Sequence, residues 1–439
     1  MKRYGFVFLL LLCALSLRAQ NYADLTFKMA VFGPSDKIFV WWGHAALIVE
    51  NTRWNSSRVF DWGIFSYPSD NFLHDFVNDR VRYKCRAGPY DLKEYLDEDR
   101  DIIVYTLNLD TAGKEAILTY AENKVLPENC YYDYHEFRNN CSTGIRDIID
   151  MGTGGQLKAW ANAAAGRFSL RQQARRFTWH SPFSDWFLDF LMGQSLDGPL
   201  TLWDEMFLPV EIARNIDGFR FTDNSGAERK LVSSVQILNS TKTRNPILQA
   251  PLSRFLPSLV SGVFAAVLFA LIAGARKKFP RAGGITWGIS QSLAGLILGA
   301  AGCVLFFGRF FLNNDYIRQN YNLLFINPLL LAAVPLGIIA AVRKPKTEQG
   351  GRGGCSLAEK ALRILWTYVF IACALTVLMK ALPVFYQRNG SVQALVLPLA
   401  FALSNMPRIC GGMGRRLSGR IFKAAVLPPL FGGSAGTNM

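Results

Sequence analysis

The chain has 439 residues, half of them hydrophobic, and a formal net charge of +15 at pH 7. Residues 251–439 hold 20 Lys and Arg against 3 Asp and Glu, whereas residues 1–250 hold 28 against 30. A nucleic-acid-binding protein would carry such an excess on a folded face among aromatic side chains. Here the basic residues flank long apolar runs, as they do in cytoplasmic loops of membrane proteins, so we expect no nucleic-acid partner.

The first 20 residues have the three regions of a secretory signal peptide. Lys2 and Arg3 precede an apolar run over residues 6–15, and Ala19 follows as a small residue near the expected cleavage point. We therefore predict a signal peptide over residues 1–20 and export of the chain that follows it.

Residues 21–250 are enough for one extracytoplasmic domain with its own core. Aromatic and β-branched residues predict strands over residues 40–50, 56–67 and 101–110. Thr111 is a possible N-cap for a helix over residues 111–127, which has helical spacing of its apolar positions. The predicted class is α+β, an antiparallel sheet with helices packed on it.

The stretch YYDYHEFRNNCSTGIRDIIDMG, residues 131–152, places one cysteine between a polar turn and an amphipathic run. Ile145, Ile148 and Ile149 share one helical face, and Gly152 provides a stop. Cys141 is therefore expected at, or just before, a helix N-terminus.

Residues 166–215 are predicted to be mostly helical, and Pro209 interrupts an amphipathic run over residues 201–212. The aromatic residues here indicate either a core or a surface that rests on the bilayer or guides acyl chains, because aromatics are typical of both. We favour the core for these side chains, which are Phe168, Phe177, Trp179, Phe183, Trp186, Phe187, Phe190 and Trp203.

Five apolar runs predict a membrane domain over residues 251–408, since a spanning helix needs about 20 apolar residues. They cover residues 255–274, 285–308, 323–342, 364–385 and 391–406. Basic residues cluster in 276–284, in 343–363 and in the tail, 409–439, and the alternate loops hold few. The positive-inside rule then predicts a multi-pass protein of the bacterial inner membrane, with the first domain extracytoplasmic and the C-terminus cytoplasmic.

The sequence holds four histidines that could act as a base for Cys141: His44, His74, His135 and His180. A nucleophilic thiol needs help to ionise, which a helix N-terminus gives, and a base within hydrogen-bond reach. We favour His44 because a strand holds its ring rigidly. His135 is the alternative, on the turn before Cys141, and His74 and His180 are assigned to surface or packing.

The third polar group of such a site would fix the second nitrogen of the imidazole. Asp61 lies on the next predicted strand and could face His44 across the ladder. The extracytoplasmic thiols are Cys85, Cys130 and Cys141, an odd number. A Cys85–Cys130 disulfide would leave Cys141 free, as we expect, whereas a Cys130–Cys141 disulfide would remove the chemistry.

A strand histidine, a polar residue on the following strand and a cysteine at a helix start occur in this order in the permuted papain-like thiol enzymes, the group that includes lecithin–retinol acyltransferase. The chain resembles them. No CxxC, HExxH or phosphate loop occurs in the sequence, so we predict neither a metal nor a cofactor.

A closer resemblance rests on WWGHAALIVE, DWGIFSY, LPENCYYDYHEFRNNCSTGIRDII, LTLWDEMFLP and NYNLLFINPLL. In this order they resemble the Lnb-type lipoprotein N-acyltransferase family, which has an extracytoplasmic domain followed by five transmembrane helices. The resemblance implies that His44 and Cys141 are a catalytic pair. One departure concerns the acidic residue before NYNLLFINP, where a histidine would be expected next, because Asp315 is followed by Tyr316.

These patterns predict a membrane-bound transacylase with membrane lipids and lipoproteins as partners. Cys141 would take an acyl chain from a lipid or lipoprotein diacylglyceryl ester as a thioester, with His44 as base and Asp61 orienting it. The resemblance implies a lipoprotein N-terminus as the accepting amine. Substrate contacts are expected from the neighbouring residues Trp42, Asn140 and Ser142. The alternatives are a cell-wall thiol amidase or peptidase and a non-enzymatic sensor or scaffold with an exported binding domain.

Overall fold

The computed structural model describes residues 22–37, 40–65, 82–89, 91–241, 244–312, 315–342 and 356–405. They form two compact units. The first holds the described residues up to Ser253 together with those of Phe307–Asn320 and Tyr386–Arg388. The second holds Arg254–Phe306 and the described residues of Tyr321–Phe385 and from Asn389 onward. The predicted signal peptide, His74 and the predicted tail lie outside the described residues.

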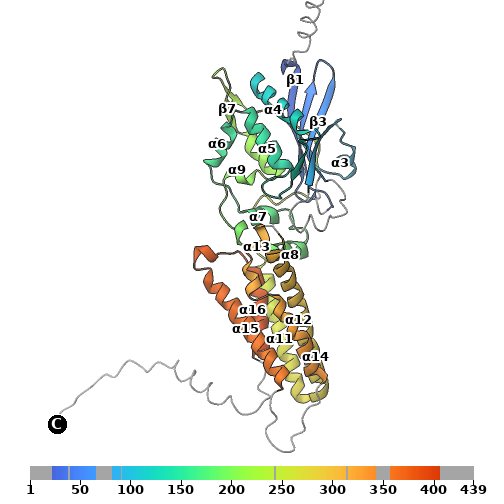
Figure 1. Ribbon diagram of the computed structural model, residues 1–439, viewed down its shortest axis with the longest axis vertical. Coiled ribbons are helices and arrows are strands. Elements are labelled where there is room, and N and C mark those ends of the chain that lie inside the picture. The colour runs from blue at the N-terminus through green and yellow to red at the C-terminus, as the bar shows by residue number, and fades with distance from the viewer. Residues whose placement is uncertain are drawn as a thin grey trace, which may run out of the picture. The chain divides into compact units, whose positions relative to one another are not determined.

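The first unit is built on a seven-stranded sheet in which every neighbouring pair is antiparallel (Figure 1). The strand order is β6-β4-β3-β2-β1-β5-β9. The strands are β1 (Leu25–Phe32), β2 (His44–Asn51), β3 (Ser56–Phe65), β4 (Arg82–Gly88), β5 (Ile102–Leu107), β6 (Tyr131–Asp133) and β9 (Val232–Asn239). An antiparallel sheet with helices confirms the predicted class.

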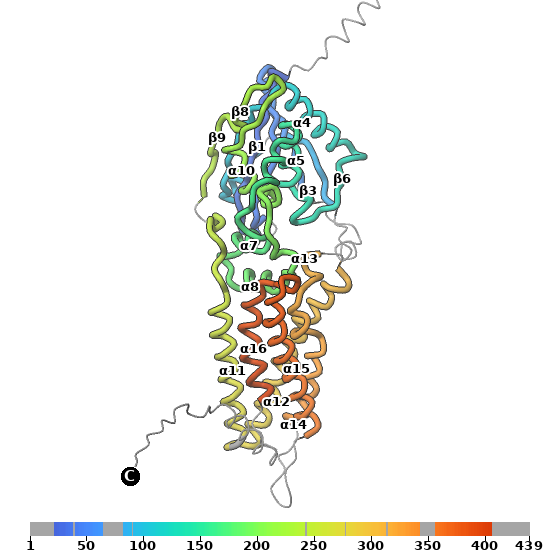
Figure 2. Tube along the Cα trace, turned by 90° about the vertical axis from the view of Figure 1, so that its left-hand side faces the viewer, coloured from blue at the N-terminus to red at the C-terminus, as the bar shows by residue number. Residues whose placement is uncertain are grey.

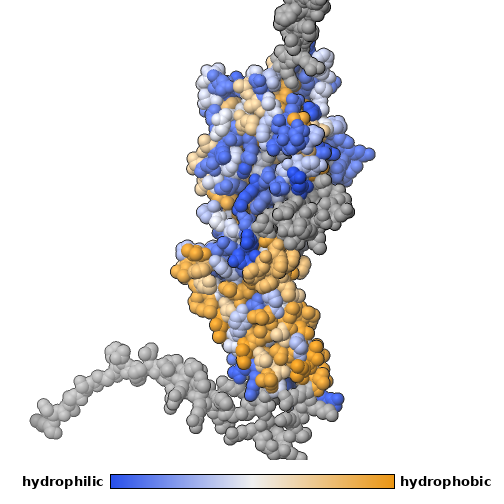
Figure 3. Space-filling model, viewed as in Figure 1, coloured by the Kyte–Doolittle hydropathy of each residue, from blue (hydrophilic) through white to orange (hydrophobic). Residues whose placement is uncertain are grey.

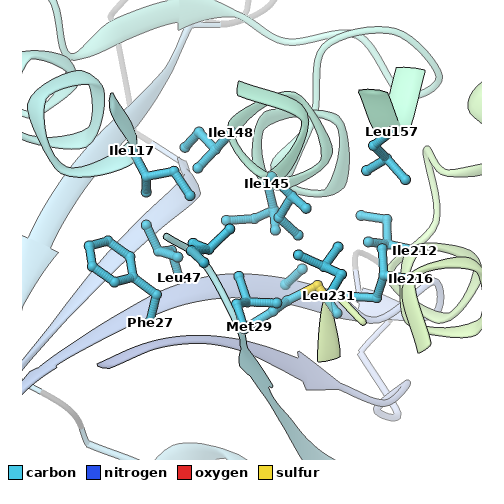
Figure 4. Close-up of a cluster of buried hydrophobic side chains, with 14 of the residues drawn as sticks. Phe27, Met29, Leu47, Ile117, Ile145, Ile148, Leu157, Ile212, Ile216 and Leu231 are labelled. Atoms are coloured by element: carbon cyan, nitrogen blue, oxygen red, sulfur yellow. The ribbon is translucent and has the colours of Figure 1, made fainter. Parts of the chain in front are cut away.

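Alternate strand residues point to opposite faces of this sheet, and most of the helices of the first unit cover one of the two faces. In Figure 4, Phe27 and Leu47 from the sheet lie opposite Ile145 and Ile148, and all four are buried in one core. The helices that supply this core are α4 (Thr111–Lys124), α5 (Cys141–Gly152), α6 (Gln156–Asn162), α9 (Leu202–Glu205) and α10 (Pro209–Asp217). On the opposite face, Phe32 packs in a smaller cluster against Tyr95 of α3 (Lys93–Asp97).

Two helix boundaries refine the prediction. The N-cap of α4 is Asp110, one residue before Thr111, because its side chain accepts a hydrogen bond of 2.8 Å from the N–H of Gly113. Pro209 separates two helices as expected and stands at the start of α10, where its missing N–H costs no hydrogen bond.

The region 166–215 divides its aromatic residues between core and surface. Phe177, Phe190 and Trp203 are buried, as we favoured, but Phe183 is 76% exposed. It lies on α8 (Pro182–Leu191), which follows α7 (Leu170–Arg175). The favoured core interpretation is therefore wrong for the outer side of α8. The other elements of this unit are η1 (Tyr22–Asp24), η3 (Gln194–Leu196), the hairpin strands β7 (Arg220–Thr222) and β8 (Glu228–Lys230), and α13 (Asp315–Arg318).

The described residues of the second unit form helices and no strands. Four segments, of which the second ends within the first unit, are long and apolar enough to span a membrane: Phe255–Arg276, Pro280–Phe310, Tyr321–Val342 and Leu357–Met379. The shorter apolar helix Gly390–Ser404 corresponds to the fifth predicted run. Figure 2 shows α11 and α16 side by side. The helices are α11 (Phe255–Lys278), α12 (Pro280–Phe310), η4 (Tyr321–Leu324), η5 (Pro328–Ala332), α14 (Ala333–Val342), α15 (Leu357–Met379), η6 (Pro383–Phe385) and α16 (Gly390–Ser404).

Several buried polar side chains in this unit are hydrogen-bonded to one another, which lowers the cost of burying them. Asn327 accepts a hydrogen bond from the N–H of Leu329, so it shapes the start of η5, and it donates to the hydroxyl of Tyr368 at 2.7 Å. Asn389 donates to the amide oxygen of Asn322 at 2.8 Å. The tail and most of the loop 343–363 lie outside the described residues, so the cytoplasmic side of the C-terminus stays a prediction.

Candidate functional site

His44 is the first residue of β2 and follows a tight turn at Gly43. Gly43 has φ of +81°, and a Cβ there would lie 2.7 Å from the carbonyl oxygen of Phe32, so this turn requires glycine. It also explains why the strand begins at His44 and not at residue 40. Pairing with Phe32 on β1 fixes the backbone of His44, which gives its ring the rigid support expected from the sequence.

Asp61 holds the imidazole of His44. Asp61 pairs with Ala46, two residues beyond His44, so the two side chains occupy diagonal positions on neighbouring strands. The Asp61 carboxylate oxygen Oδ1 lies 2.8 Å from Nε2 of His44. The structure thus brings these residues together as expected, and Nδ1 is the ring nitrogen that remains for the thiol.

Cys141 is the first residue of α5, as the sequence predicts. Asn140 caps this helix: its side chain accepts from the N–H of Thr143 at 2.9 Å, and the Thr143 hydroxyl accepts from the N–H of Asn140 at 2.8 Å. The first N–H groups of a helix lack partners within the helix and give its start a partial positive charge. Cys141 therefore lies where a thiolate is stabilised.

The pKa values of Cys141 and His44 shift toward an ion pair. Burial alone would lower the pKa of His44, but the charge of Asp61, the charge of Cys141 and hydrogen bonds to both place it well above its ordinary value. Burial would raise the pKa of Cys141, but the charge of His44 and hydrogen bonds from His44 and the Ala45 N–H lower it. A thiolate beside an imidazolium is the reactive form of such a pair.

Gly63 lies directly against this pair and was not predicted as a site residue. It has φ of +114° and lies at a bulge, where the register of β3 on β4 shifts between Trp62 and Ile64. A Cβ on Gly63 would lie 3.5 Å both from Cβ of Cys141 and from Cε1 of His44. The glycine keeps a side chain out of this position. A lone glycine in the strand pattern DWGIF is the signal that could have found it.

The charge of Cys141 also acts on three tyrosines at the β4–β6 edge of the sheet, which are Tyr83, Tyr132 and Tyr134. The rings of Tyr83 and Tyr134 stack at 4.0 Å between centroids. Burial, the charge of Glu136 and the charge of Cys141 raise the pKa of Tyr83 to about 12. Burial first, and then the charge of Cys141, raise the pKa values of Tyr132 and Tyr134. The buried hydroxyl of Tyr132 has no hydrogen-bond partner among the described residues.

His135, the alternative base, has partners of its own. Its Nδ1 accepts a hydrogen bond of 3.2 Å from the N–H of Phe137, and its Nε2 lies 3.4 Å from Asp315 Oδ1. Both ring nitrogens are thus engaged, Nδ1 within the turn that precedes Asn140 and Nε2 with α13. His180 packs edge-on against Trp41 and contacts Arg244, which fits the packing role predicted for it.

The three predicted substrate-binding residues differ in what they leave open to a ligand. Asn140 donates both amide hydrogens internally, to the carbonyl oxygens of Glu136 and Phe207, so in this structure its side chain positions α5. Trp42 donates its indole N–H to the carbonyl oxygen of Ala174 at 3.0 Å. Ser142 is buried, with its hydroxyl 3.9 Å from the Cys141 sulfur. Substrate contact by these residues stays a prediction.

Asp315 and Tyr316, where the sequence departs from the family pattern, contact the turn before Asn140. Asp315 forms an ion pair with Arg138 and lies 3.4 Å from Nε2 of His135. The Tyr316 hydroxyl donates to the carboxylate of Glu136 at 3.1 Å. The residue after Asp315 is a tyrosine, and the histidine that contacts Asp315 is His135, which lies far earlier in the chain.

Cys85, Cys130 and Cys141 are all free thiols, so Cys141 is free without a Cys85–Cys130 disulfide. Burial first, and then the charge of Asp61, raise the pKa of Cys85 to about 12, which leaves it an inert core thiol. No group of three or more His, Cys, Asp or Glu that could hold a metal occurs in the described part of the chain. The absence of a metal or cofactor from the working protein stays a prediction.

Two family models match the chain in succession. The family model described as the Lnb N-terminal periplasmic domain matches residues 14–179, and the model described as the Lnb transmembrane domain matches residues 252–348. The comparison with curated proteins found no match, and neither did the comparison with solved structures. Two matched domains in this order show that the chain belongs to the Lnb family, bacterial membrane proteins with an extracytoplasmic N-terminal domain.

Proposed function

We propose that this protein is a membrane-bound, cysteine-dependent acyltransferase that moves a fatty acyl chain from an ester to an amine. The observation that carries the proposal is the Cys141–His44–Asp61 arrangement, in which the thiol has a lowered pKa and the imidazole a raised one. A cysteine that only filled space would resemble Cys85, whose pKa burial raises to about 12. The contrast favours an enzyme over a sensor or scaffold.

The first half-reaction transfers the acyl chain to the enzyme. The Cys141 thiolate attacks the carbonyl carbon of a lipid ester, or of the diacylglyceryl ester of a lipoprotein, and forms a C–S bond. As the tetrahedral intermediate collapses, the C–O bond breaks and the His44 imidazolium donates its proton to the leaving oxygen. The products are an acyl-thioester on Cys141, a neutral His44 and a free alcohol.

The second half-reaction passes the acyl chain to an amine. The amine attacks the thioester carbonyl, neutral His44 accepts its proton, and the C–S bond breaks to regenerate the thiolate–imidazolium pair. The net change is ester plus amine to amide plus alcohol. The proposed acceptor is the N-terminal amine of a lipoprotein, and the family resemblance is what suggests it.

Both half-reactions place negative charge on a carbonyl oxygen, which needs hydrogen-bond donors. The N–H groups of Cys141 and Ser142 at the start of α5 are the proposed donors, because helix-start N–H groups lack partners within the helix. The buried Tyr132 hydroxyl is a further candidate, since it has no partner among the described residues and the charge of Cys141 acts on it. Asp61 keeps the imidazole oriented through both steps.

Trapping the acyl-enzyme tests the proposal. Full-length protein in vesicles that contain a diacyl lipid with labelled acyl chains should acquire label that hydroxylamine releases. Peptide mapping should place the label on Cys141, and Cys141→Ala should not acquire it. Cys303→Ala, which removes a thiol from α12, is the matched control and should label like the wild type. Label on another residue, or undiminished labelling of Cys141→Ala, would refute the mechanism.

The acceptor is tested in cells. In a strain without this gene, mass spectrometry of lipoprotein N-termini should show loss of the N-linked acyl chain, and the wild-type gene, but not its Cys141→Ala form, should restore it. Unchanged N-termini together with altered cell-wall peptides would favour the amidase or peptidase alternative. Unchanged N-termini and an unchanged cell wall would favour the sensor or scaffold.

A further inference from the structure

Helix α8 turns its charged side chains inward. Arg175 on α7 binds both carboxylate oxygens of Asp185 at 2.9 Å. Arg171, also on α7, binds Asp189 at 3.0 Å. Asp185 and Asp189 are each 2% exposed. Asp185 is thus bound at both oxygens and Asp189 at one, so the two carboxylates of α8 are paired with arginines within the first unit.

The other side of α8 is aromatic and exposed. Phe183 is 76% exposed and Phe187 39%, and Trp179, which precedes the helix at the same four-residue spacing, is 44% exposed. We call these three residues the aromatic face of α8. The rings of Phe183 and Phe187 lie parallel, 6.1 Å apart. Figure 3, viewed as Figure 1, shows hydrophobic surface where Figure 1 labels α8.

Three hydrogen-bonded contacts tie α7 and α8 to the chain just before apolar membrane segments. Arg175 donates to the carbonyl oxygen of Leu252 at 3.2 Å, three residues before α11 begins. Asn320, the residue just before the span Tyr321–Val342, donates to the carbonyl oxygens of Phe190 and Leu191 at 2.8 and 3.1 Å. Gln387, three residues before α16, donates to the carbonyl oxygen of Met192, the residue that follows α8, at 2.9 Å.

All three contact points belong to the first unit by their own packing, and in the predicted topology each precedes an apolar segment at its extracytoplasmic end. A helix that is tied to three such points, with its charges paired inward and its aromatic rings outward, has the arrangement of an interfacial helix. Aromatic rings are also enriched at this level of a bilayer. We propose that the aromatic face of α8 lies in the outer leaflet, at the boundary between phospholipid headgroups and acyl chains.

The residues of α8, PFSDWFLDFL, include no lysine or arginine. Attraction of a basic helix to anionic headgroups therefore does not operate here, and burial of apolar area drives the contact. Binding of α8 to lipid should accordingly not depend on the anionic lipid content or on salt.

This placement has a consequence for the site. The consequence rests on the proposed function, whereas the lipid contact itself does not. Helix α7, which binds both carboxylates of α8, also accepts the indole hydrogen bond of Trp42 at Ala174. Trp42 lies two residues before His44. The interfacial helix would thus be connected to the Cys141–His44 pair through α7 and Trp42.

Photocrosslinking tests the lipid contact without reference to activity. Full-length protein carrying a benzophenone amino acid in place of Phe183 is placed in nanodiscs of phosphatidylethanolamine and phosphatidylglycerol and irradiated. The matched control carries the probe in place of Trp54, which is 70% exposed on the turn between β2 and β3. Mass spectrometry should find phospholipid adducts at position 183 and not at position 54, and removing phosphatidylglycerol should leave them unchanged.

Equal lipid adducts at both positions, or adducts at 183 to a second copy of the chain, would overturn the proposal. Position 187 provides a second probe site if the variant at 183 does not fold, which resistance to carbonate extraction and limited proteolysis would show. Absence of lipid adducts at 187 in folded protein would likewise overturn it. Because the assay needs no turnover, a negative result here and a negative acyl-labelling result remain distinct.

Discussion

His44 and His135 are two histidines that each place Nε2 against an aspartate, yet their surroundings differ. His44 lies in the central sheet, 2.8 Å from an Asp61 side chain that is 13% exposed. His135 lies in a short turn, 3.4 Å from an Asp315 side chain that is 41% exposed. Nδ1 of His44 remains for Cys141, whereas Nδ1 of His135 accepts from the backbone. What distinguishes a base from a structural histidine is therefore the second nitrogen and the rigidity of the support.

The largest expected effect comes from removing a member of the reacting pair. Cys141→Ala should lower acyl transfer to background, and His44→Ala should lower it by about 10²–10⁴-fold, the usual contribution of a general acid–base group. Initial rates in proteoliposomes measure both. The melting temperature should change little for Cys141→Ala, because a small side chain at a helix start loses little packing. Wild-type rates in His44→Ala would remove His44 from the mechanism.

Gly63→Ala should have the next largest effect. The new methyl would meet Cys141 and His44 at an ordinary contact distance of 3.5 Å, but φ of +114° disfavours alanine, so the backbone of β3 should shift beside the reacting pair. Displacement of reacting groups by about 1 Å can cost about 10²-fold in rate. The backbone conformation adds strain of about 1–3 kcal/mol, so the melting temperature should also fall. Gly88→Ala on the neighbouring strand is the matched control, because a Cβ there meets nothing within 4 Å. Equal rates in both variants would show that Gly63 does not shape the site.

The positions of His44 and Cys141 could be predicted because local patterns determine them. An apolar strand around His44, a helix stop at Gly152 and isoleucines at helical spacing are short-range signals. The helix ends at Gly152 as predicted, and the strand is present but begins at His44 instead of residue 40. The role of Asp61 could be predicted for a related reason, because consecutive antiparallel strands lie side by side and bring their residues together.

The remaining features depend on contacts between distant residues. Asp315 meets Arg138 across 177 positions and Asn320 meets Phe190 across 130, and no local pattern reports such pairs. The aromatic residues of α8 could not be divided between core and surface either, because the inward side is set by Arg171 and Arg175 on another helix. Hydrophobic residues alone do not show which side of a helix is covered.

Asp61→Asn should have a moderate effect, about tenfold in rate, because it replaces a charge-assisted hydrogen bond by a neutral one. It should also change the pH dependence of Cys141 alkylation. In the wild type the pKa of Cys141 is lowered, so the thiolate persists to pH values below those of an ordinary cysteine. The Asp61 charge stabilises the imidazolium that lowers it. The alkylation midpoint should therefore rise in Asp61→Asn, and an unchanged midpoint would contradict this coupling.

The smallest effect is expected for His135→Ala, which tests the other half of the comparison. Its contact with Asp315 is partly solvated, and even charged pairs of this exposure contribute only about 0–1 kcal/mol, so the rate should stay within about fivefold of the wild type. Any loss should act through the turn that leads to Asn140, because Asp315 and Tyr316 hold that turn from residues far along the chain. It should then be shared by Tyr316→Phe, which removes the hydrogen bond to Glu136 and leaves both histidines in place.

The pH midpoint for alkylation of Cys141 should be unchanged in both variants, because neither substitution touches the thiol or its base. A loss in His135→Ala as large as that in His44→Ala, together with a raised midpoint, would reverse the assignment and make the turn histidine the base.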